Sequence, residues 1–157
     1  MTKLLFYFLE CHHFSNAASD EKITEFLIAN GAYVKAHYSD GKTPLHLAAN
    51  KSVIIAEVLI SHGANINAKD IFGYTPLHIA VQSKYFSSMV KFLTEQGADV
   101  NAIDNDMKTP LHYVVEEYDP SIDYVKILIS SGANVNAMDI NGNTPLQYAI
   151  KKIIKKL

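Results

Sequence analysis

The apolar residues of the chain recur in short phrases that are separated by polar turns. Each phrase places a leucine two residues after a threonine, and further apolar residues follow at the spacing of one helical face. The phrases are "TPLHLAA" at Thr43, "TPLHIAV" at Thr75, "TPLHYVV" at Thr109 and "TPLQYAI" at Thr144. Threonine before proline favours a helix start, because the hydroxyl caps free backbone N–H groups and proline needs no partner there. The pattern predicts a helix after each of these threonines.

A second set of phrases predicts where another helix ends in each unit. These phrases are "GAYVKA" at Gly31, "GANINA" at Gly63, "GADVNA" at Gly97 and "GANVNA" at Gly132. Glycine can take the left-handed conformation that terminates a helix. Apolar residues stand four and five positions before each glycine: Leu27, Leu59, Leu93, Leu128, Phe26, Val58, Phe92 and Ile127. We expect them to form a core with the leucines of the first helices, Leu45, Leu77, Leu111 and Leu146.

The spacing between the two sets of phrases orients the units. The count from each glycine to the next threonine is always twelve, whereas the count from threonine to glycine is 20, 22 and 23. We therefore expect the connection between units to be constant in length, and the turn between the two helices to vary freely.

The repeated phrases resemble one known family. The threonines are 32, 34 and 35 residues apart, and the "TPLH" phrase with a period of about 33 residues resembles the ankyrin repeat family. The resemblance implies an all-α solenoid, an ankyrin repeat stack of helix-turn-helix units joined by hairpin-like fingers. It implies a single domain over residues 1–157, which divides into a degenerate N-terminal cap repeat at 1–36, full repeats at 37–68, 69–102 and 103–137, and a C-terminal half-repeat cap at 138–157.

Both ends of the chain depart from the pattern. Thr2-Lys3-Leu4-Leu5 can be laid over "TPLH", and we expect a cap folded onto the second repeat; a contact surface and an end of a longer array are the alternatives. At the other end the apolar residues Leu146, Ala149, Ile150, Ile153, Ile154 and Leu157 oppose Lys151, Lys152, Lys155 and Lys156. This pattern predicts one amphipathic helix that closes the stack, with membrane or calmodulin-like binding as the alternative.

Composition narrows the class of partner and the compartment. Hydrophobic content is 48% and the net charge is −2, which favours a globular protein and selects neither nucleic acid nor a membrane as the partner. All fourteen basic residues are lysines. Arginine, which usually binds guanine and phosphate through two parallel hydrogen bonds, is therefore absent. Cys11 is the single cysteine, which favours a reducing, cytoplasmic location. We expect a monomer, with self-association through the apolar N-terminal helix as the alternative.

The histidines of the repeats do not form a metal site. His46, His78 and His112 occur once per unit, and stacked helices lie about 8–10 Å apart, too far for one ion bound at about 2.0–2.1 Å. The resemblance implies that each histidine links its own threonine to the backbone of the following repeat. The residues given such structural roles are Thr43, His46, Thr75, His78, Thr109, His112, Thr144, Gly63, Gly97 and Gly132. We expect no catalytic residue, metal or cofactor, and we predict that the chain is not an enzyme.

The segment "DIFGYTPLH" is the strongest indication of a binding site. Ile71, Phe72 and Tyr74 surround a glycine where a polar turn is expected, and apolar anchors of this kind are typical of hot spots. The alternative is that Ile71 or Phe72 packs back on a neighbouring finger. The resemblance implies that fingers and first helices together bind proteins, and the predicted contact residues are Ile71, Phe72, Tyr74, Lys42, Lys51, Gln82, Asn105, Lys108, Glu116, Glu117 and Asn141.

The predicted function is a non-catalytic protein–protein interaction module that binds through the concave finger and first-helix face. The alternatives are a structural segment of a larger ankyrin array, or a secreted effector of an intracellular microbe that is delivered into a host cell and acts on host proteins.

One finger departs from the others at its turn. Met107 stands where the other fingers have Gly41, Gly73 and Gly142. A positive φ at this position would cost methionine about 1 kcal/mol or more. We therefore expect a reshaped or more mobile third finger.

Overall fold

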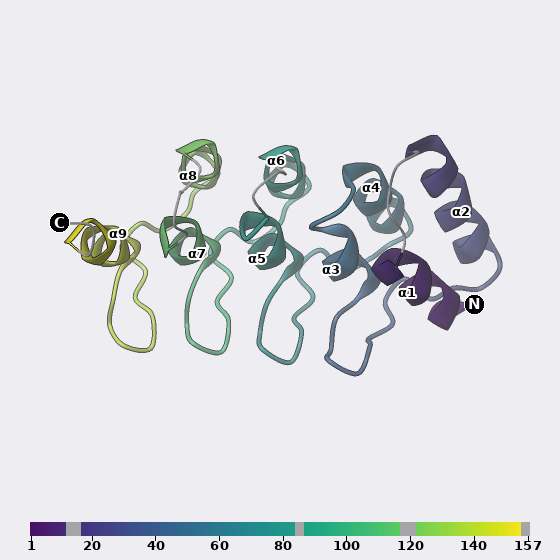
Figure 1. The fold of residues 1–157 in the computed structure, drawn as a ribbon, viewed down its shortest axis with the longest axis horizontal. Coiled ribbons are helices and arrows are strands. Elements are labelled where there is room, and N and C mark those ends of the chain that lie inside the picture. Colours follow the sequence, from purple (N-terminus) through teal and green to yellow (C-terminus); the bar gives the residue numbers. More distant parts are fainter. Residues whose placement is uncertain (12–16, 84–86, 117–121, 155–157) are drawn as a thin grey trace.

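The computed structural model describes residues 1–11, 17–83, 87–116 and 122–154, and in these residues it shows two rows of helices above a row of fingers (Figure 1). The first row contains α1 (Thr2–Cys11), α3 (Pro44–Ala48), α5 (Pro76–Val81), α7 (Pro110–Glu116) and α9 (Pro145–Ile154). The second row contains α2 (Ala17–Ala29), α4 (Val53–Ser61), α6 (Ser87–Glu95) and α8 (Ile122–Ser130). The described part of the chain has no strands, so the predicted all-helical solenoid is confirmed.

Each full repeat is held to the next through its histidine. The backbone N–H of Thr43 donates to His46 Nδ1 over 3.1 Å, so this nitrogen is the acceptor. The other ring nitrogen, Nε2, then carries the proton and donates to the Tyr74 carbonyl in the following repeat over 2.8 Å. His78 and His112 make the same links to the carbonyls of Lys108 and Asn143, over 3.2 and 3.1 Å. The predicted threonine–histidine–backbone connection is confirmed.

The predicted leucines form the core of the three inner repeats. Leu45, Leu77 and Leu111 of the first helices are buried. Leu59, Leu93 and Leu128 of the second helices are completely buried, and Leu27 is nearly so. Of the side chains five positions before each glycine, Val58 is buried, whereas Phe92 and Ile127 are half-buried against the core.

Two predicted core residues lie on the surface, one at each end of the stack. Leu146 is 66% exposed, because α9 packs on α7 and no described helix covers its other side. Phe26 is 62% exposed, because α2 has no preceding repeat in the described residues to pack against. The prediction that α9 buries its apolar face is also wrong for Ile150, Ile153 and Ile154, which are exposed.

The N-terminal helix is aligned one residue away from the predicted register. Leu5 and Leu9 are completely buried against the core, whereas Leu4 is exposed. Leu5 therefore has the buried place that Leu45 has in the next repeat, one residue later than the overlay of Thr2 on Thr43 predicts. Helix α1 packs on α3 and α2 packs on α4, so the first pair of helices continues the stack.

Fingers are joined edge to edge by backbone hydrogen bonds. Within the second finger, the Asp70 N–H donates to the Tyr74 carbonyl and the Gly73 N–H to the Asp70 carbonyl, over 3.0 Å each. The Ile71 N–H donates to the Asp40 carbonyl of the first finger, and the Asn105 N–H of the third donates to the Phe72 carbonyl. An added residue would break this register, which accounts for the constant spacing of twelve.

The third finger keeps the turn of its neighbours despite its methionine. Met107 has a φ of 59°, in the same left-handed region as the φ of 82° at Gly73 and 74° at Gly142. Its N–H donates to the Asp104 carbonyl over 3.1 Å, as Gly73 does to Asp70. The expected reshaping of this finger is therefore wrong, and the cost of a positive φ falls on Met107 itself.

Candidate functional site

The fingers and the first helices together form one side of the stack, which we call the inner face. In the third and fourth fingers, the residue just before the "TP" pair connects the two. Lys108 Nζ at the base of the third finger lies 2.7 Å from Glu116 Oε2 on α7. Lys151 on α9 donates to Asn143 Oδ1 of the fourth finger over 2.7 Å. The finger bases and first helices therefore present a continuous surface.

Aromatic rings order the middle of the inner face. The Tyr74 side chain is half-buried, because its ring packs edge-on against Tyr113, with centroids 5.7 Å apart, and lies tilted against the His78 ring at 5.9 Å. The Tyr113 hydroxyl donates to the Asp104 carboxylate and lies 3.2 Å from the Tyr74 hydroxyl. Burial and the hydrogen bond to Asp104 raise the pKa of Tyr113 well above its usual value. Tyr74 is thus a support for the second finger more than a part of its tip.

The same aspartate–tyrosine pair recurs in the next repeat. Asp139 Oδ1 accepts from the N–H groups of Asn141 and Asn143, and its Oδ2 accepts from the Tyr148 hydroxyl over 2.5 Å. Burial alone would raise the pKa of this carboxyl, but the hydrogen bonds from Tyr148 and the backbone outweigh burial and lower it to about 2. Asp139 is therefore a carboxylate over the whole physiological pH range.

Asp70 has the same place in the second finger but lacks the tyrosine. Its Oδ1 accepts from the N–H groups of Phe72 and Tyr74, over 2.9 Å each. Its Oδ2 is buried and has no hydrogen-bond partner, because Ile79 stands where the other repeats have Tyr113 and Tyr148.

Lys108 lies between the two tyrosines. Its Nζ is 5.3 Å from the centroid of the Tyr113 ring and 4.8 Å from that of Tyr148, within the range of cation–π attraction. Burial disfavours the charge on Lys108, but the hydrogen bond to Glu116, together with attraction to Glu116 and interactions with Tyr148, outweighs burial and raises the pKa of this lysine. Lys108 and Glu116, which were predicted to contact a partner, are therefore paired with each other in this structure.

The tip of the second finger is the most prominent apolar feature among the predicted contact residues. Ile71 and Phe72 are 57% and 55% exposed, so neither folds back onto a neighbouring finger. The ring of Phe72 is tilted against that of Tyr74, with centroids 6.1 Å apart. Met107 and Ile140, on the third and fourth fingers, are also exposed. The sequence predicted an apolar tip for the second finger alone, because no other tip combines two large apolar residues.

The remaining predicted contact residues differ in their exposure and in whether their side chains already form hydrogen bonds or ion pairs within the chain. Gln82 and Asn141 are exposed, and the Asn105 amide donates to the Ile71 carbonyl over 2.9 Å. Lys42 Nζ pairs with Asp40 Oδ2 at 2.8 Å. Lys51 Nζ donates to the carbonyls of Leu9 and Glu10 at the end of α1, over 2.5 and 2.7 Å. Glu117 lies outside the described residues.

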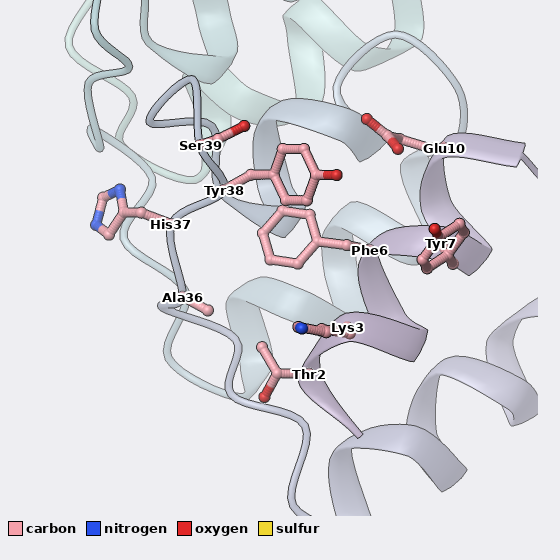
Figure 2. Close-up of a pocket in the computed structure, with 9 residues that line it drawn as sticks. All are labelled: Thr2, Lys3, Phe6, Tyr7, Glu10, Ala36, His37, Tyr38 and Ser39. Atoms are coloured by element: carbon pink, nitrogen blue, oxygen red, sulfur yellow. The ribbon is translucent and has the colours of Figure 1, made fainter.

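A pocket of about 320 Å³ opens at the N-terminal end of the inner face, between α1 and the first finger (Figure 2). Its floor is the ring pair of Phe6 and Tyr38, whose centroids are 5.2 Å apart. Lys3, Tyr7 and Glu10 of α1 line the helix side. This pocket was not predicted from the sequence, although one signal was present: Tyr38 occupies the position at which the other fingers have Asp70, Asp104 and Asp139.

The described residues offer little for other kinds of site. They contain no group of three or more His, Cys, Asp and Glu side chains that could hold a metal ion. Within the same residues no helix is long and apolar enough to cross a membrane.

Comparison with known proteins agrees with the repeated geometry. A model of ankyrin repeats (three copies) matches residues 13–104 and again residues 86–157, which together include most of the chain. None of the curated proteins compared with the chain matches it. With the threonine–histidine links, the stacked helix pairs and the edge-joined fingers, this match shows that the chain belongs to the ankyrin repeat family.

Proposed function

We propose that the chain is a non-catalytic module that binds a partner protein through its inner face, with the tip of the second finger at the centre of the contact. Ankyrin repeats are generally protein-interaction modules and are typically non-catalytic. The observation that carries the proposal is the exposure of Ile71 and Phe72 on a finger whose base is held rigid by Tyr74. A rigid, exposed apolar pair loses little conformational entropy on binding, which is the property of a hot spot.

Polar residues surround this apolar tip in the manner of an interface rim. Gln82 on α5 and Asn141 on the fourth finger are exposed, and the side-chain amide of Asn105 is anchored to the second finger. Lys108 already forms an ion pair with Glu116, so it presents little net charge to a partner. Apolar contact at the second finger is therefore expected to supply most of the affinity, and the polar residues the specificity.

A comparative pull-down tests this proposal. Wild type is compared with an Ile71→Ser, Phe72→Ser double variant, and with a Tyr33→Ser control at an exposed site after α2. Partners captured by wild type and by the control, but lost by the double variant, would support the second finger as the centre of binding. Equal capture by all three proteins would refute it. Matched melting curves establish that each variant is folded.

A structural role in a larger repeat array is the second candidate function. It is favoured by the apolar side chains exposed at both ends of the stack, such as Leu4 and Phe26 at one end and Leu146 and Ile153 at the other. Association through the ends that persists in the Ile71→Ser, Phe72→Ser variant would distinguish this role from binding at the finger.

A further inference from the structure

The fifth repeat of the stack has a first helix but no described second helix. Figure 1 shows α2, α4, α6 and α8 in one row, and the place beside α8 and above α9 holds no described helix. Leu146 in α9 is 66% exposed, whereas the equivalent Leu45, Leu77 and Leu111 are 0%, 0% and 3% exposed. The side of α9 that inner repeats cover is therefore bare.

Helix α8 is bare on the adjoining side. Ile122 and Ile129 are exposed. Their equivalents in α4, Val53 and Ile60, are partly buried against the core. Together with Leu146 and Ile150 of α9, these isoleucines form an apolar surface that we call the open end.

The inner repeats show what kind of element fits this surface. The equivalent places are filled by α4, α6 and α8, each a helix of nine residues. Each inserts one completely buried leucine, Leu59, Leu93 or Leu128, four residues before its terminating glycine. Because the repeats share one geometry, the open end has the shape of a site for one short amphipathic helix.

A single charge distinguishes the open end from a purely apolar site. Lys126 lies one turn from Ile122 and near Ile129 on the same side of α8, and it is exposed. No described acidic residue forms an ion pair with it. A helix that approaches this surface would gain from an acidic side chain opposite Lys126.

We propose that the open end binds one amphipathic helix of a partner protein, with an apolar stripe and an acidic residue beside it, in the place that a second helix would have in the fifth repeat. The site is separate from the inner face. A second copy stacked head to tail fits poorly, because α1, which packs against α2, would overlap α9 when that α2 took this place.

A peptide copied from the chain itself provides the probe. Residues 52–64 contain α4 with its capping serine and terminating glycine, and Glu57 is their only acidic or basic residue apart from His62. Binding of the labelled peptide to the full chain is followed by fluorescence anisotropy. We expect saturable binding, and a loss of about tenfold in a Leu146→Asp, Ile150→Asp variant, which removes the apolar contact. Ile129→Asp, on the other helix, should weaken binding in the same way.

Charge reversal tests the acidic part of the proposal. A Glu57→Lys peptide should bind wild type more weakly than the Glu57 peptide, and a Lys126→Glu protein should reverse that order. An Ile71→Ser, Phe72→Ser protein should bind the peptide as wild type does. The proposal is overturned by absent binding, by binding that ignores the open-end substitutions, or by an unchanged order of the two peptides with Lys126→Glu. Sedimentation that shows a dimer dissociated by Leu146→Asp would instead assign the surface to a second copy.

Discussion

Three aspartates occupy the same place at the base of their fingers, and they differ in one hydrogen bond. Asp104 and Asp139 receive a tyrosine hydroxyl at Oδ2, whereas the Oδ2 of Asp70 is buried without a partner. A buried acceptor without a donor costs about 1–3 kcal/mol. The third repeat, residues 69–102, therefore contains a local defect beneath the finger that we propose as the centre of binding.

Replacing the residue opposite Asp70 should remove this defect. We expect Ile79→Tyr to raise the free energy of unfolding by about 1 kcal/mol, because the new hydroxyl can donate to Asp70 Oδ2 as Tyr148 does to Asp139. Urea unfolding followed by circular dichroism measures the change. Tyr148→Phe is the converse control and should lower stability by about 1–3 kcal/mol. A loss of stability in Ile79→Tyr would contradict the assignment.

Met107 carries strain at a single backbone angle. Its φ of 59° lies in the left-handed region, where a side chain costs about 1 kcal/mol relative to glycine. Met107→Gly should therefore raise the free energy of unfolding by about 1 kcal/mol, measured by thermal or urea denaturation.

Two glycines provide matched controls for this prediction. Gly142→Ala should cost a similar amount, since no atom lies within 4 Å of the new Cβ. Gly73→Ala should cost more, since the new Cβ would lie 2.8 Å from the Asn105 backbone nitrogen of the next finger. Equal losses at the two positions would mean that the close approach of the fingers is not important for stability.

At the scale of whole elements, α1 depends on a lysine from another repeat. Lys51 Nζ donates to the last carbonyls of α1, at Leu9 and Glu10, and a cation at a helix C-terminus also interacts favourably with the helix dipole. Lys51→Met should loosen α1, by about 1 kcal/mol after allowance for solvent exposure. Hydrogen exchange should show faster exchange in α1 and unchanged exchange in α5. Unchanged protection of α1 would refute the capping role.

The histidine links make the stack sensitive to acid. Burial lowers the pKa of His46 and His78 below the usual value of 6.5, because the charged ring loses its hydration there. The neutral ring is also the form that accepts from the threonine N–H. At pH values between the lowered pKa and about 6.5, the unfolded chain therefore binds more protons than the folded chain. The histidines should make their whole contribution to the free energy of unfolding above this pH window. That contribution should fall as the pH decreases through the window.

Substitution of the two histidines separates their effect from that of other groups. Gln147 shows that glutamine can accept from the threonine N–H, over 2.7 Å at Thr144. A His46→Gln, His78→Gln variant should be less stable at pH 8, because the glutamine side chain extends less far toward the carbonyl of the next repeat. Its melting temperature should also change less than that of wild type between pH 8 and pH 5. Parallel pH profiles would contradict the role assigned to these rings.

At the scale of the whole molecule, the sequence predicts what every repeat shares and fails where a repeat lacks a neighbour. The period, the helix starts and the histidine links follow from local chemistry that is the same in each unit, and these predictions are confirmed. Leu146 and Phe26 have the sequence of core residues, but burial depends on the repeat beside them. The pocket at Phe6 and Tyr38 combines distant parts of the chain, and only the missing aspartate at position 38 indicated it.

The substantial contacts between described helices join helices of the same repeat or of adjacent repeats. The unit of evolutionary change for such a molecule is therefore the repeat. Duplication or loss of one segment from threonine to threonine, 32 to 35 residues here, leaves the remaining contacts intact. Recombination within a gene could lengthen or shorten the stack by one finger at a time, and could thereby change the span of partner surface covered without redesign of any side chain that remains.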